Sequence, residues 1–124
     1  MKSALRAGAA TCAAFVVTAM GTSSASAQPG VGNVQYGSRG AGVTCVQIAV
    51  NAFYSSRLEP MFAIAVDGVF GKDTRRGVMD FQRALGDRYY AVDGIVGPRT
   101  GTELWADYLA ATDPYCYKVI PTLK

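Results

Sequence analysis

Residues 66–74 read VDGVFGKDT, and residues 92–100 read VDGIVGPRT. Each Asp-Gly pair is a turn signal, because glycine adopts positive φ cheaply and an Asp carboxylate accepts hydrogen bonds from amides two residues on. The second glycine of each copy stands where a helix N-cap belongs, and a threonine follows in the first turn. We therefore interpret the repeat as two equivalent scaffold loops, each of which starts a helix. The loop residues are Asp67, Gly68, Gly71 and Thr74 in the first copy, and Asp93, Gly94, Gly97 and Thr100 in the second.

The hydrophobic pattern around these loops predicts an all-α fold, a compact three-helix bundle. From Val43, apolar residues recur at steps of three and four on more than one face, which indicates a well-buried first helix. The second helix is expected to start near Lys72, and the third at Pro98, a favoured first helical residue. We expect Val69 and Ile95 of the two loops to fill the core. The helical residues expected to face inward are Val43, Val46, Val50, Phe53, Val78, Phe81, Leu85, Leu104 and Leu109.

The first 27 residues have the order of a secretory signal peptide. Lys2 and Arg6 precede an apolar stretch, and small residues lead to an Ala-Ser-Ala cleavage site. The alternative, a membrane anchor, needs about 20 apolar residues, and this stretch is shorter. We therefore expect three parts: a signal peptide at 1–27, a flexible N-terminal segment at 28–33, and one domain with a C-terminal tail at 34–124.

Two cysteines remain after such a leader is removed, since Cys12 lies within it. Outside the cell a lone pair of cysteines is most simply a disulfide, here Cys45–Cys116. In the chain-entropy model a loop of this length contributes roughly 4 kcal/mol to stability. The alternative is a reactive or metal-binding thiol, which would act without help from histidine because the chain has none.

Composition argues against several classes of function. Without Lys2 and Arg6, the chain carries 10 basic and 9 acidic residues, a net charge of +1 that favours neither nucleic acid nor an anionic membrane. With no histidine and its two remaining cysteines expected to pair, the chain lacks the usual zinc ligands, and no cofactor or metal is expected. The acids are scattered, so we expect no enzyme. A catalytic carboxylate pair of Asp67 and Asp93 remains the alternative to their role in turns.

Two groups of side chains are candidates for ligand binding. The first group combines a cation with two tyrosines beside the second loop, and the second group is cationic and falls at four- and seven-residue steps along the second helix. Arginine grips carboxylates, and aromatic rings contact glycans. The alternatives are local packing for the first group and a solvated face, paired by Asp80, for the second. The candidates are Arg88, Tyr89 and Tyr90 in the first group, and Lys72, Arg76 and Arg83 in the second.

The ordered motifs resemble the peptidoglycan-binding-domain-like family, small three-helix modules attached to many bacterial cell-wall hydrolases. The likeness runs from about residue 34 to 104 and rests on two DG-loops that flank a Phe-Gln helix. The motifs are GSRG at 37–40, VQ at 46–47, DGVFG at 67–71, FQ at 81–82 and DGIVGPRT at 93–100.

The resemblance implies a secreted, non-catalytic module, extracellular or attached to the cell wall, that binds the glycan or the stem peptide of peptidoglycan as a monomer. The alternative is a secreted interaction module that binds another protein, for example a cell-wall hydrolase. Three departures from the pattern stand out. Residues 87–89 look inserted, and Gly77 replaces an alanine, which should cost the helix about 1 kcal/mol. Gly101 stands where tryptophan is frequent, and Trp105 is expected to supply that bulk.

Overall fold

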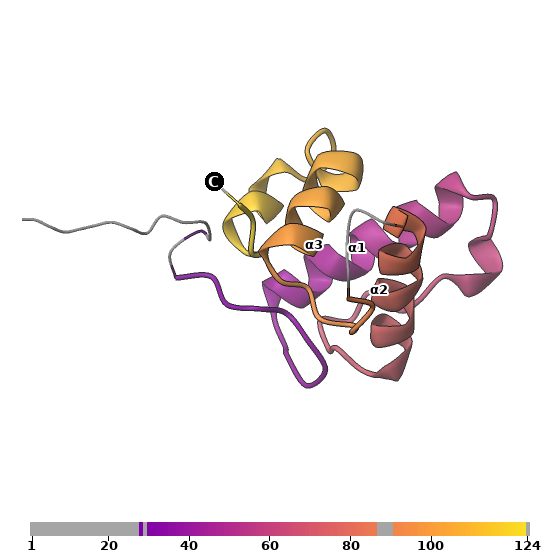
Figure 1. The fold of residues 1–124 in the computed structure, drawn as a ribbon, viewed down its shortest axis with the longest axis horizontal. Coiled ribbons are helices and arrows are strands. Elements are labelled where there is room, and N and C mark those ends of the chain that lie inside the picture. Colours follow the sequence, from indigo (N-terminus) through magenta and orange to yellow (C-terminus); the bar gives the residue numbers. More distant parts are fainter. Residues whose placement is uncertain (1–27, 29, 87–90, 124) are drawn as a thin grey trace, which may run out of the picture.

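The computed structural model describes residues 28, 30–86 and 91–123, which fold as a bundle of helices (Figure 1). This part of the chain contains no β-strand, so the predicted all-α bundle is confirmed. None of its helices is long and apolar enough to cross a membrane. The three α-helices are α1 (Ala41–Ser56), α2 (Lys72–Leu85) and α3 (Pro98–Leu104). The short helices are η2 (Pro60–Phe62), the π-helix η4 (Trp105–Leu109) and η5 (Pro114–Lys118).

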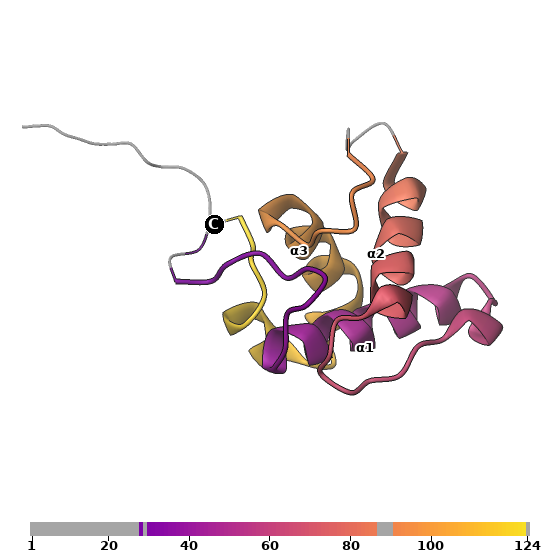
Figure 2. The same ribbon diagram turned by 90° about the horizontal axis from the view of Figure 1, so that it is seen from below.

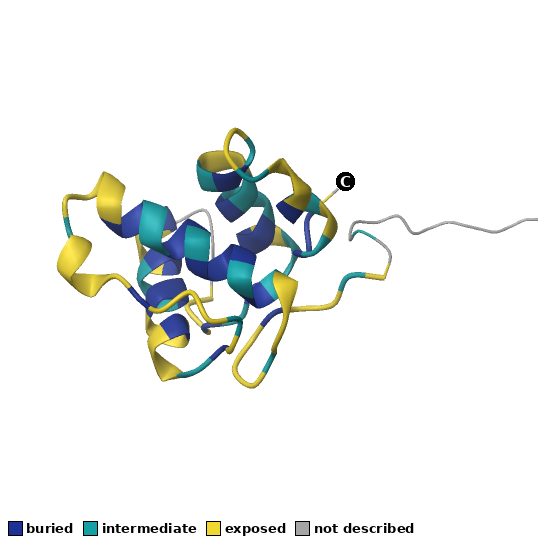
Figure 3. Cartoon of the chain, turned by 180° about the vertical axis from the view of Figure 1, so that it is seen from behind, coloured by how far each residue is buried: buried dark blue, intermediate teal, exposed yellow. Residues whose placement is uncertain are grey.

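Helix α1 runs through the middle of the molecule and is buried on two sides. Figure 1 shows α2 and α3 on either side of α1, and Figure 2 shows α2 standing steeply against it. This explains why apolar residues occupy more than one face of α1, whereas α2 buries a single stripe. Figure 3 shows the buried residues gathered where the helices meet. All nine helical residues predicted to face inward are buried.

The prediction that Val69 and Ile95 fill the core is wrong. Val69 is exposed and Ile95 is half-buried, while their successors Phe70 and Val96 are buried in the core. Val69 and Val96 each form an antiparallel bridge, so the chain leaves both turns in an extended form. Side chains alternate in extended backbone, and the residue that follows each expected plug therefore points inward.

The predicted disulfide is present and joins α1 to the C-terminal tail. Cys45 and Cys116 lie 71 positions apart in sequence, and their Cα atoms are 5.8 Å apart. Both cysteines are buried, as is Ile120 farther along the tail. The tail backbone also approaches Gly101 of α3 so closely that a Cβ there would collide with the carbonyl oxygen of Pro121. The tail therefore takes the space that Trp105 was expected to fill.

Gly77 has a packing reason that the sequence did not reveal. It is buried in α2, and a Cβ at this position would lie 2.5 Å from Cγ1 of Val50 in α1. The missing side chain lets the two helices approach each other. The expected loss of helix propensity is therefore offset by closer contact between α1 and α2.

The segment before α1 contacts both loops. Val34 exchanges two backbone hydrogen bonds with Val96, at 3.0 and 2.8 Å. Further along, the backbone N–H of Phe70 donates to the carbonyl oxygen of Ser38 at 3.0 Å. At the start of the described chain, the N–H of Gln28 donates to the carbonyl oxygen of Thr122 at 3.1 Å. This segment thus ties the two loops and the tail together.

Candidate functional site

The first loop is organised around one buried side chain, Gln47 of α1. Its Oε1 accepts the backbone N–H groups of Asp67 and Gly68, at 3.0 and 2.9 Å. Its Nε2 lies 3.0 Å from Oδ1 of Asp67, 3.1 Å from the carbonyl oxygen of Val69 and 3.0 Å from Oγ1 of Thr74. One amide therefore fixes the turn, the following extended residue and the first turn of α2.

The second loop repeats this arrangement around Gln82 of α2. The side-chain Oε1 accepts the N–H groups of Asp93 and Gly94, at 3.1 and 3.0 Å. Its Nε2 lies 3.1 Å from Oδ1 of Asp93, 3.0 Å from the carbonyl oxygen of Ile95 and 3.2 Å from Oγ1 of Thr100. The repeated sequence is thus a repeated hydrogen-bond network, in which a glutamine of one helix builds the loop that starts the next.

Both glutamines belong to the family motif, but the sequence alone indicates no role for them. The sequence did contain one signal: a glutamine precedes the aspartate of each DG-loop, Gln47 by 20 positions and Gln82 by 11. Each aspartate also accepts a hydrogen bond inside its own loop, from the N–H of Val69 or Ile95. For Asp67, this bond and the Gln47 amide lower the pKa of the carboxyl group below its ordinary value of 3.8.

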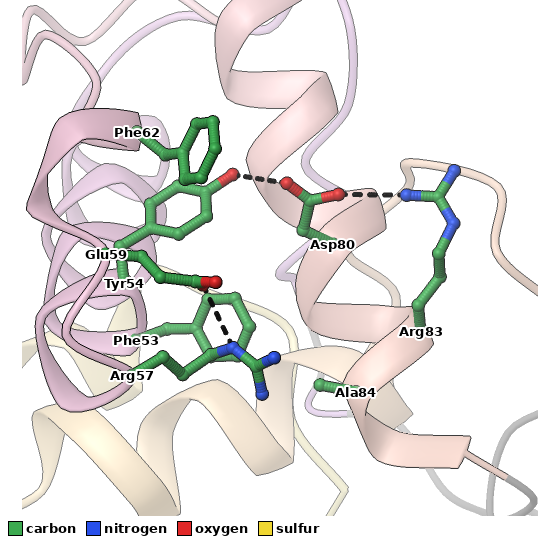
Figure 4. Close-up of a pocket in the computed structure, with 8 residues that line it drawn as sticks. All are labelled: Phe53, Tyr54, Arg57, Glu59, Phe62, Asp80, Arg83 and Ala84. Atoms are coloured by element: carbon green, nitrogen blue, oxygen red, sulfur yellow. Dashed lines mark hydrogen bonds and ion pairs between the residues drawn. The ribbon is translucent and has the colours of Figure 1, made fainter.

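A hollow of about 370 Å³ opens between the end of α1, the η2 segment and α2, and we call it the α1–α2 hollow. Figure 4 shows an ion pair on each side of it: Arg57–Glu59 on the α1 side, and Asp80–Arg83 on α2, with the Asp80 carboxylate between the Tyr54 hydroxyl and the Arg83 guanidinium. The lining residues are Phe53, Tyr54, Arg57, Glu59, Phe62, Asp80, Arg83 and Ala84.

Asp80 is the central acceptor of this hollow. Its Oδ2 accepts the hydroxyl of Tyr54 at 2.7 Å, and its Oδ1 accepts Nη1 of Arg83 at 2.9 Å. Burial, and then the hydrogen bond to Asp80, raise the pKa of Tyr54, so its hydroxyl stays a donor at neutral pH. On the opposite wall, Nε of Arg57 donates to Oε1 of Glu59 at 3.1 Å.

Two of the three aromatic rings beside the α1–α2 hollow, those of Phe53 and Tyr54, are already covered by cations, whereas Phe62 is exposed. The guanidinium of Arg57 lies over the Phe53 ring, 5.4 Å from its centroid. That of Arg76 lies over the Tyr54 ring at 6.0 Å, and it also donates to the carbonyl oxygen of Phe62 at 2.8 Å. Both contacts are within the range of cation–π attraction. Arg76 therefore holds the η2 segment against α2.

The structure separates the three cations predicted on α2. Arg83 lines the α1–α2 hollow, whereas Arg76 is engaged with η2 and lies 3.6 Å from Asp73. Lys72 lines a smaller hollow of about 170 Å³ beside the first loop. The predicted residues Arg88, Tyr89 and Tyr90 lie outside the described residues. Arg57 and Glu59, which sequence reasoning did not select, join Arg83 in the hollow.

The second loop borders another hollow, of about 360 Å³, whose lining includes Asn33, Asp93 and Pro98. Across the described ranges, no group of three or more His, Cys, Asp or Glu side chains is arranged to hold a metal ion.

The comparison with protein families agrees with this architecture. A family model for the peptidoglycan binding domain matches residues 39–104, which include α1, both loops, α2 and α3. The chain belongs to the peptidoglycan-binding domain family. No curated protein and no solved structure matches it. The tail that carries Cys116 lies outside the matched region, and Cys45 lies within it.

Proposed function

We propose that the protein acts outside the bacterial cell as a non-catalytic module that binds peptidoglycan, and that the α1–α2 hollow is its contact surface. The family match supports the ligand class. The observation that carries the location is the pair of exposed arginines, Arg57 and Arg83, in one open hollow. Peptidoglycan stem peptides carry carboxylates, which guanidinium groups bind with charge-assisted hydrogen bonds.

Three of the remaining predicted contacts belong to the same proposal as a second candidate surface. Arg88, Tyr89 and Tyr90 lie outside the described residues and shortly precede the second loop in sequence. The two candidate surfaces can be separated by mutation because they are made of different residues.

The test is sedimentation of the oxidised protein with insoluble peptidoglycan. We expect the wild type to pellet and Arg57→Gln/Arg83→Gln to bind at least tenfold more weakly, since a hydrogen bond to a charged group contributes about 1.5–3 kcal/mol. Both ion pairs are exposed, and such pairs contribute about 0–1 kcal/mol to folding, so the variant should stay folded.

The matched control is Arg39→Gln/Lys118→Gln, which removes the same charge from two exposed positions outside the α1–α2 hollow. A parallel variant, Arg88→Ala/Tyr89→Ala/Tyr90→Ala, tests the second surface. If only this last variant loses binding, the function stands and the site moves to the second loop. A wild type that stays in the supernatant contradicts the proposed function.

One observation favours a second candidate function, docking to another secreted protein such as a cell-wall hydrolase. Leu58, between α1 and η2, and Met61, within η2, are presented to solvent, with 85% and 73% of their surfaces exposed. Leu58 also has a φ of 60°, which is unusual for a residue other than glycine and is found at strained functional sites. Failure of the wild type to sediment would favour this candidate.

A further inference from the structure

We propose that the α1–α2 hollow accepts a zwitterionic end of a stem peptide, where a free ammonium and a free carboxylate lie close together. This inference rests on the proposed function and names the part of the polymer that the site contacts. It follows from the placement of the charged side chains in the hollow and from the guanidinium groups that cover two of its aromatic rings.

The charges of the hollow are balanced and arranged as two opposed pairs. Arg57 and Glu59 are joined at 3.1 Å on one wall, and Arg83 and Asp80 at 2.9 Å on the other (Figure 4). The formal charges of the four groups cancel, so a ligand of one sign gains at one member of each pair and loses at the other. A ligand that carries both signs can match both members.

Both walls retain hydrogen-bonding capacity. A guanidinium has five N–H donors, and Arg57 and Arg83 each use one for their carboxylate. The side chains of these arginines are 51% and 57% exposed, so their other donors are accessible to a ligand carboxylate. Glu59 accepts Arg57 through Oε1, and its second oxygen can accept an ammonium.

Two of the three aromatic rings that line the hollow offer no free face to a sugar. Glycans are commonly held by exposed aromatic faces together with hydrogen-bonding side chains. Here Phe53 and Tyr54 are buried, and guanidinium groups already cover their rings at 5.4 and 6.0 Å, whereas Phe62 is 45% exposed. Displacing either cation would remove a cation–π contact. Of the lining rings this leaves Phe62 for a stacked sugar, whereas both walls offer charged partners to an ionic end group.

The test is a nuclear magnetic resonance titration of the full chain, purified with its disulfide intact. Three probes are compared: a stem tetrapeptide with its side-chain ammonium and C-terminal carboxylate free, the same peptide acetylated on that ammonium, and an N-acetylglucosamine tetramer. We expect the free peptide to shift residues of the α1–α2 hollow. Acetylation should raise its Kd about tenfold, because one charged hydrogen bond is lost.

Two variants connect the probes to the residues. Glu59→Gln should raise the Kd of the free peptide about tenfold, because the ammonium loses its charged acceptor, and it should not raise the Kd of the acetylated peptide, which has no ammonium there. Arg83→Gln should weaken both peptides, and Lys118→Gln should weaken neither. Equal binding of the free and acetylated peptides, or shifts in the hollow with the sugar tetramer alone, would overturn the inference.

The titration and the sedimentation test can give different answers, so a failure of this inference can be told apart from a failure of the proposed function. If the wild type sediments with peptidoglycan but only the sugar tetramer binds the hollow, peptidoglycan binding stands and the zwitterion inference fails. If the free peptide binds the hollow but the wild type does not sediment with peptidoglycan, the hollow has the inferred chemistry and the proposed function fails.

Discussion

The two loop-and-helix units of this chain, 67–85 and 93–109, share their internal bonds and differ in what surrounds them. Gln47 and Gln82 each reach the same five groups of their own loop. The first unit continues into the 14-residue α2, whereas the second continues into the 7-residue α3 and then a π-helix. The repeated sequence therefore starts two helices in the same way, and the segments packed around each unit determine how its helix continues and what it contacts.

The largest expected effect tests whether the two networks are equivalent. Gln47→Leu and Gln82→Leu each leave several partly buried N–H and C=O groups without these partners, so we expect each to lower the free energy of unfolding by about 3 kcal/mol. Chemical denaturation of the oxidised protein measures this. The control Gln35→Leu, at an exposed position, should change it by less than about 0.5 kcal/mol. If one of the two buried glutamines is tolerated, the units are not equivalent.

The glycines of the two helices sharpen the comparison. Gly101→Ala places a Cβ against the carbonyl oxygen of Pro121, so the disulfide-linked tail must move, and we expect a loss of about 3 kcal/mol. Gly77→Ala meets Cγ1 of Val50 and gains helix propensity, so a net loss of about 1 kcal/mol is expected. Thermal unfolding should rank the two variants in this order.

The control for both glycines is Gly32→Ala, at an exposed position outside the helices. A Cβ there meets nothing within 4 Å, and φ lies outside the left-handed region, so the change should be nearly neutral. A stable Gly101→Ala protein with its tail in place would show that the tail tolerates the added group. The contrast between the two units would then lose its physical basis.

The helices and loops could be predicted from the sequence because their signals are local. The disulfide could be predicted because two cysteines remain after the expected leader. The sequence did not predict the roles of Gln47 and Gln82, because their partners come from loops brought close only by folding. It misplaced Val69 and Ile95 by one position, since the bridges that fix the register are formed with a distant segment.

The candidate site was less predictable than the fold. Arg83 was selected from spacing along one helix, but its companions Arg57 and Glu59 come from the end of α1 and the loop after it. No periodic pattern relates these positions. Gly101 likewise read as a missing tryptophan, although the space at that position is taken by a tail outside the family pattern.

The smallest expected effect concerns the charge of the first loop. The N–H of Val69, and then the amide of Gln47, favour the carboxylate of Asp67 and lower its pKa below 3.8. The folded state therefore binds this proton more weakly than the unfolded state. The stabilisation is present above pH 3.8 and is lost as the pH falls through the lowered pKa of the folded state.

Asp67→Asn keeps the acceptor oxygen and removes the charge, so we expect it to be less stable than the wild type near pH 6. The difference should narrow as the pH falls below about 4, because the wild-type carboxylate becomes protonated. Denaturation midpoints measured from pH 6 to pH 2.5 test this, and a difference that stays constant with pH would contradict it.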